Sequence, residues 1–270
     1  MTGPVCAARP KARCVPNLCA RRIMQRSDTV LKQVVAAFER ESHLKLHNHP
    51  IHMSFDDDAL TVAGEVPDVA SKKRLLQLTR LHSEGKRVVD QLRVTANPPV
   101  ADGELRTRIC ERLAQAVDFR NCVICARVKG ELEVLRGTMD EAGNDGSGVI
   151  EITVKDGVVT LTGQVISLSH RRLASVTAWW VGGCRDVVNL LELVPAEADG
   201  DDEMSDVLHL VLETDPRVRA AQITINVENH RITLAGWVAT EAESRQAEQD
   251  AWCMDAIGGV VNRIQVRASI

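Results

Sequence analysis

Apolar and polar residues alternate in several short stretches of this chain, most clearly between residues 150 and 162. Residues 150–154 read Ile-Glu-Ile-Thr-Val and residues 159–162 read Val-Thr-Leu-Thr, with Asp156-Gly157 between the two runs. A period of two with one polar side predicts strands of a sheet that is buried on one face only. Asp156-Gly157 predicts a type I′ hairpin turn, because both residue types tolerate positive φ.

The same pattern occurs three times without a gap, in residues 51–94, 150–193 and 223–266. Each copy opens with Ile, has a glycine near the end of its second strand and closes on paired valines. The residue after the valines is Asp90, Asn189 or Asn262. No phosphate-binding glycine loop surrounds these glycines, so we interpret them and the turn glycine as structural: Gly64, Gly157, Gly163 and Gly236.

Helical spacing of small and apolar residues follows each glycine, as in Ala174, Ala178 and Val181. A second apolar stripe at helical spacing precedes each copy, as in Leu105, Ile109 and Leu113. The last strand must return parallel to the second one through a right-handed crossover. We therefore predict an α+β protein of three tandem α-β-β-α-β units, each with two helices on one face of a small three-stranded mixed sheet.

Composition divides the chain at its Pro-, Gly- and acid-rich segments. The units are predicted at 27–96, 102–195 and 202–268, after a disordered basic leader at 1–26. The second unit contains an insertion near 119–148, which we interpret as a strand or hairpin followed by a loop. Because each apolar sheet face points toward its own helices, we expect three separable domains, each with a core of its own.

Charge and targeting signals narrow the classes of function. Six basic residues in the leader leave 27 basic residues against 37 acidic ones in the remainder, so nucleic-acid binding is not expected. The chain has no apolar run of about 18 residues, which predicts that it is not transmembrane. The leader lacks the apolar core of a signal peptide, so we expect a cytoplasmic protein with reduced cysteines. Cys122 and Cys125 fall on a predicted strand and point to opposite faces, and neither a metal site nor a cofactor is predicted.

The combination of strand, Asp-Gly turn, "VTLTG-V", helix and "V-VVN-L-V" resembles the BON domain, named for bacterial osmotically inducible and nodulation proteins. The second unit carries the most specific match, from Asp156 and Gly157 to Asn189. The resemblance implies a non-enzymatic module with phospholipid or membrane-surface association and chaperone-like roles. We therefore expect a non-catalytic lipid- or membrane-surface-binding protein of bacterial stress or envelope physiology. The alternative is a soluble protein–protein adaptor or chaperone-like scaffold.

Two sets of side chains are candidate contact residues. Trp179 and Trp252 occupy equivalent positions in units two and three, beside Trp180. On a helical wheel they lie away from the face that meets the sheet, which predicts partial exposure and contact with another unit or a partner. The second helix of unit one is basic, and it predicts a solvated face, an inter-unit contact or an anionic-surface contact for Lys72, Lys73, Arg74, Arg80, Lys86 and Arg87.

Overall fold

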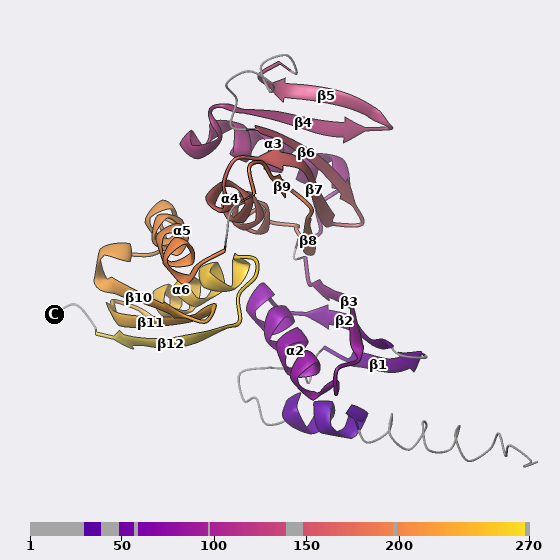
Figure 1. Ribbon diagram of the computed structural model, residues 1–270, viewed down its shortest axis with the longest axis vertical. Coiled ribbons are helices and arrows are strands. Elements are labelled where there is room, and N and C mark those ends of the chain that lie inside the picture. The colour runs from indigo at the N-terminus through magenta and orange to yellow at the C-terminus, as the bar shows by residue number, and fades with distance from the viewer. Residues whose placement is uncertain are drawn as a thin grey trace, which may run out of the picture.

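The computed structural model describes residues 30–38, 49–56, 59–96, 98–138, 148–196 and 199–267. Three helix–sheet units lie around a central group of helices, with each sheet on the outside (Figure 1). The predicted α+β class and the repeated helix–sheet units are confirmed. The predicted leader at 1–26 lies outside the described residues.

Units one and three have the same three-stranded sheet. Unit one, preceded by helical residues 30–38, contains β1 (Ile51–Asp56), β2 (Ala59–Val66), α2 (Val69–His82) and β3 (Arg87–Val94). Unit three contains α5 (Asp201–Thr214), η4 (Ala220–Gln222), β10 (Ile223–Glu228), β11 (Arg231–Val238), α6 (Glu241–Cys253) and β12 (Gly259–Val266). In each sheet the first two strands are antiparallel and the third is parallel to the second, as the crossover argument predicted.

Unit two has a larger sheet because its insertion forms a hairpin. Its elements are α3 (Asp102–Gln115), η2 (Val117–Phe119), β4 (Cys122–Val128), β5 (Glu131–Arg136), β6 (Gly148–Lys155), β7 (Val158–Val165), α4 (Leu168–Trp179), β8 (Asp186–Asn189) and β9 (Glu192–Leu193). The strand order is β5-β4-β6-β7-β8, and β9 also pairs with β7. The hairpin turns at Lys129 and Gly130, which both have positive φ, and β4 joins the sheet by parallel pairing with β6.

Each crossover helix begins at the same place in its unit with a side-chain cap. Asp68, Ser167 and Thr240 accept a hydrogen bond from the backbone N–H three residues later. Such a cap stabilises a helix by about 1 kcal/mol, because it satisfies a backbone donor that the helix leaves without a partner. The caps therefore fix where the chain leaves the second strand and turns into the helix.

The hairpin turns of units two and three are held by the first helix of the same unit. Asp156 and Gly157 have φ of 54° and 76°, as a type I′ turn requires. The carboxylate of Asp102, the first residue of α3, accepts both of their N–H groups at 2.8 Å. Asp201 of α5 accepts from Asn229 and His230 in the same way, so the two preceding helices are tied to equivalent turns.

Gly163 and Gly236 occupy equivalent positions where the first two strands approach closely. Gly163 pairs with Ile150 and has φ of 117°, and Gly236 pairs with Ile223 and has φ of 118°. A Cβ on Gly163 would lie 2.2 Å from the oxygen of Val149, which no side chain tolerates. The glycines are therefore required by the backbone.

The buried side chains form two cores, not three. Unit one encloses its own cluster, which includes Val34, Leu60 and Leu92. The cores of units two and three form one continuous cluster, in which Val176 of α4 and Trp252 of α6 take part. The expectation of a separate core for each unit is therefore wrong for units two and three, because α5 and α6 pack directly against α4.

Candidate binding groove and inter-unit junction

The three units meet where α2, α4 and α6 come together, at the centre of Figure 1. From α2 of unit one, the ammonium of Lys73 donates to the carbonyl oxygen of Met254 at 2.6 Å, and Gln77 donates to that of Gly258. Burial lowers the pKa of Lys73, and the nearby charge of Asp255 partly opposes this shift. Unit one is therefore held to the end of α6 by two polar contacts, of which the one from Lys73 is partly buried.

A second set of charges joins unit one to unit two. The ammonium of Lys72 lies 3.0 Å from Asp90 of its own unit and 2.7 Å from Asp186 of β8, and it also donates to the carbonyl of Leu92. Arg93 lies 2.8 Å from the same Asp186. Burial raises the pKa of Asp186, while Lys72 lowers it through its charge and hydrogen bond.

Lys72 also explains why unit one departs from the repeat. In units two and three, Asn189 and Asn262 each donate to a carbonyl and a serine of the crossover helix and accept a backbone N–H two residues later. Asp90 keeps the acceptor, because Leu92 N–H donates to it at 2.8 Å. It lacks the amide donor, and Lys72 supplies the bond from helix to strand instead.

Units two and three are joined by hydrogen bonds to the carboxylates of Asp250 and Asp255. Ser175 and Asn189 donate to Asp255, at 2.6 and 2.8 Å. The indole Nε1–H of Trp180 donates to Asp250 at 2.8 Å. Burial raises the pKa of Asp250 to about 7.

Asp215 lies close to Asp250 and has the opposite shift. Burial by itself would raise the pKa of Asp215, but hydrogen bonds and charge from Arg217 outweigh that effect and lower it. Because the two pKa values are moved apart, the pair carries one negative charge, on Asp215, just below pH 7, and a second one as pH rises past it. The contact between units two and three therefore contains a titratable group.

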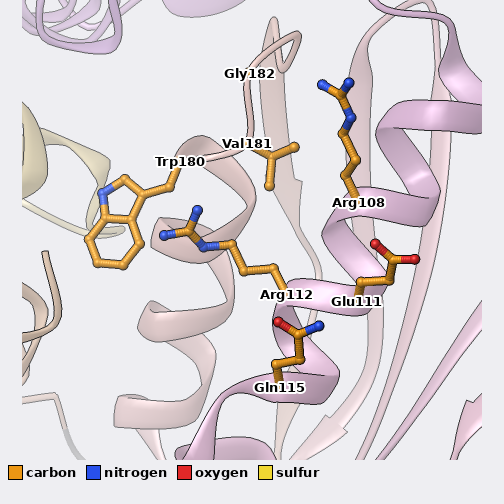
Figure 2. Close-up of a pocket in the computed structure, with 7 residues that line it drawn as sticks. All are labelled: Arg108, Glu111, Arg112, Gln115, Trp180, Val181 and Gly182. Atoms are coloured by element: carbon orange, nitrogen blue, oxygen red, sulfur yellow. The ribbon is translucent and has the colours of Figure 1, made fainter. Parts of the chain in front are cut away.

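A groove lies beside this junction, between α3 and the segment after α4 (Figure 2). It has a volume of about 440 Å³ and is lined by Arg108, Glu111, Arg112, Gln115, Trp180, Val181 and Gly182. Figure 2 shows Arg112 extending from α3 toward the Trp180 ring, and its guanidinium carbon lies 5.2 Å from the ring centroid. This distance is that of a cation–π contact.

The predicted tryptophans lie in three different environments. Trp180 joins units two and three and borders the groove, and Trp179 is half-buried. Trp252 is only 2% exposed, so its predicted partial exposure is wrong. The helical wheel relates Trp252 only to the sheet of unit three, whereas neighbouring units cover the other side of α6.

The six basic residues divide into a junction set and an exposed set. Lys72 is 3% exposed, Lys73 contacts Met254, and Arg74 lies 3.9 Å from Glu248 of α6. The burial of Lys72 corrects the prediction of an anionic-surface contact for that residue. The exposed set, at the far end of α2 and beyond it, consists of Arg80, Lys86 and Arg87.

The described cysteines are all buried free thiols: Cys110, Cys122, Cys125, Cys184 and Cys253. Cys122 belongs to the core of unit two, and Cys125 lies three residues later on the same strand. Within the described ranges, no group of three or more His, Cys, Asp or Glu side chains could hold a metal ion. None of the helices in the described part of the chain is long and apolar enough to span a membrane.

Asp186, Asp255 and Arg112 are contact residues that the sequence analysis missed. Asp186 is a polar residue at the start of β8, and Asp255 is a polar residue just after α6. Arg112 lies on the polar side of an amphipathic helix. The one available signal was Asp90, which stands where the other two units have asparagine. Its partner Lys72 lies 18 residues earlier on another element and could not be paired with it from the repeat alone.

Comparisons with known proteins are consistent with this architecture. The family model of the BON domain matches residues 123–195 and 201–268, together more than half of the chain, and a BON-like domain matches residues 57–96. A comparison with curated proteins finds no match.

Two solved structures are similar to the chain, both of CdsD, a structural protein of the type III secretion system of Chlamydia trachomatis. The first, its C-terminal domain, is 15% identical, and the similarity covers 82% of this chain and 93% of that one. The second is 13% identical and covers 89% and 93%, and the TM-score is 0.22 for both.

The family matches indicate what kind of role the chain has. The BON-domain matches point to a binding or scaffolding role. The chain belongs to the BON domain family.

Proposed function

We propose that this BON-domain protein is a rigid three-unit scaffold that binds protein partners. The observation that carries the proposal is the junction, in which partly buried hydrogen bonds join α2 of unit one and unit two to unit three, and a buried ion pair joins α2 to β8 of unit two. Domains joined by flexible linkers alone would not bury charged groups such as Lys72 and Asp186 between them. A fixed arrangement of three modules is suited to presenting surfaces to a partner.

The division of the basic residues favours a protein partner over a lipid surface. Three of the six residues that could contact anionic headgroups have contacts at the junction, and the chain as a whole has a net charge of -4. Electrostatic attachment requires several basic residues on one face, each contributing about 1 kcal/mol near an anionic membrane. Arg80, Lys86 and Arg87 alone would provide weak attachment that salt screens.

Attachment to an anionic membrane surface is the second candidate, and the exposed position of Arg80, Lys86 and Arg87 favours it. Co-sedimentation with neutral and anionic phospholipid vesicles, at low and at physiological salt, separates the two candidates. We expect no binding to anionic vesicles at physiological salt. Sedimentation that persists there and is abolished by Arg80→Glu, Lys86→Glu and Arg87→Glu would instead support the lipid surface.

Rigidity is tested independently by small-angle X-ray scattering of the intact chain. We expect one narrow size distribution for the wild type. Lys73→Glu places a negative charge beside the Met254 carbonyl and Asp255, so it should release unit one and enlarge the radius of gyration. Arg87→Glu, at an exposed site outside the junction, is the matched control. A wild-type profile that already requires several unit arrangements would refute the scaffold.

A further inference from the structure

The groove between α3 and the segment after α4 holds an arginine that stacks on an aromatic ring and has no anionic partner among the described residues. Arg112 stacks over the Trp180 ring. Its guanidinium makes no hydrogen bond or ion pair with any of the residues that the structure describes. A guanidinium is a planar fork of five donors that matches a carboxylate, and here that fork faces open space.

The groove is also positioned by contacts on its other side. Trp180 is held because its Nε1–H donates to Asp250 of unit three, so the ring under Arg112 has one orientation. A binding surface that is ordered before the partner arrives loses less conformational entropy on binding. Arginine and tryptophan are also the residues that most often dominate the binding energy of protein interfaces.

The charges of the groove select the kind of partner. Arg108, one helical turn before Arg112, lies along the same wall, and its guanidinium contacts Glu104 on α3. Glu111 is the one acidic residue of the lining, and Figure 2 shows its carboxylate turned away from Trp180. Arg112 therefore borders the opening without an anionic partner among the described residues, and Arg108 can exchange its exposed Glu104 contact, a weak surface pair, for a partner's carboxylate. Gln115 and Trp180 line the same opening.

We propose that this groove binds an acidic peptide segment of a protein partner, with carboxylates accepting from Arg112 and Arg108 and the peptide stem packing on Trp180. The inference rests on the proposed scaffold function and names the chemistry of its partner. The groove of about 440 Å³ accommodates a few side chains, which fits a short segment and not a folded domain. The charge complementarity selects acidic residues, because the lining carries two arginines against one glutamate.

The test uses the intact chain and fluorescein-labelled hexaglutamate, with hexaglutamine and hexalysine as comparison peptides. Fluorescence anisotropy at about 150 mM salt gives the affinity under screened conditions. We expect hexaglutamate to bind and the other two peptides not to bind. Arg108→Ala with Arg112→Ala should weaken hexaglutamate binding at least about tenfold, because charge-assisted bidentate bonds are lost. Arg80→Ala with Arg87→Ala removes the same charge from exposed positions of unit one and should change it less than about twofold.

Each outcome decides the proposal. Equal losses of hexaglutamate binding in both double variants would show that the peptide binds by overall charge and would refute the groove as its site. If hexaglutamate does not bind to the wild type, the proposal is refuted as well. If the groove double variant fails to melt like the wild type, Arg112→Lys keeps the charge and removes the fork, and it should still weaken binding. If the groove proposal is refuted, the proposed scaffold function can still hold, because scattering and vesicle sedimentation test that function without this peptide.

Discussion

The carboxyl of Asp250 is the most informative single group in the junction, because it joins two units and titrates near neutral pH. It accepts from Trp180 of unit two and from Gln246 of its own helix, and the side chain of Asp250 is fully buried. Replacing it by asparagine keeps an oxygen acceptor for the indole and supplies an N–H₂ group that can face Asp215. The variant Asp250→Asn therefore removes the ionisation and keeps the shape.

The magnitude follows from the pKa. Burial raises the pKa of Asp250 from its usual 3.8 to about 7, and the charge of Asp215 adds to this while the Trp180 hydrogen bond opposes it. Between these two values the folded protein keeps a proton that the unfolded chain has lost. Stability therefore falls as pH rises from about 4 to about 7, by up to 1.36 kcal/mol per pH unit, and levels off above that. The full difference is about 4 kcal/mol as an upper limit.

Urea unfolding of wild type and Asp250→Asn between pH 4 and pH 8 measures the effect. We expect the variant to gain stability over the wild type as pH rises through this range, with the difference largest at the alkaline end. Asp206→Asn, at an exposed position of α5, is the matched control and should give a much smaller slope. A difference that does not change with pH would refute the assignment of a protonated Asp250 to the folded state.

Three further predictions follow from the junction, the repeat and the thiols. Lys72→Met removes the buried cation between Asp90 and Asp186 but leaves Arg93 paired with Asp186, so it should lower the free energy of unfolding by about 1.5 to 3 kcal/mol in urea, and a loss below about 1 kcal/mol would contradict the assigned ion cluster. Gly163→Ala should cost about 2 to 4 kcal/mol because of its positive φ and the contact with Val149, while Gly103→Ala on α3 should stabilise by up to about 1 kcal/mol in the same assay. Burial raises the pKa of the described cysteines. These thiols should therefore react slowly with a thiol reagent in the native protein and fully after denaturation. Disulfides in freshly isolated protein would contradict the expected cytoplasmic, reduced state.

The repeat itself was readable from the sequence because its signals are local. Strand alternation, the Asp156-Gly157 turn and the glycine that closes each second strand are fixed by interactions among residues near one another in the chain. They predicted the strands, the crossover helices and the parallel return of the last strand, and the structure has them all. The caps at Asp68, Ser167 and Thr240 were equally local, and a search for helix starts would have found them.

The arrangement of the units was decided only by the tertiary structure. Lys73 and Met254 are 181 residues apart, and Trp180 and Asp250 are 70 apart, so no periodicity relates them. A helical wheel reports how a residue faces its own sheet, and it therefore predicted exposure for Trp252, which a neighbouring unit covers. The same limit applies to Lys72 and Arg112. Whether a charged side chain on a polar helix face meets water, a buried carboxylate or an aromatic ring depends on which element of another unit packs against that face.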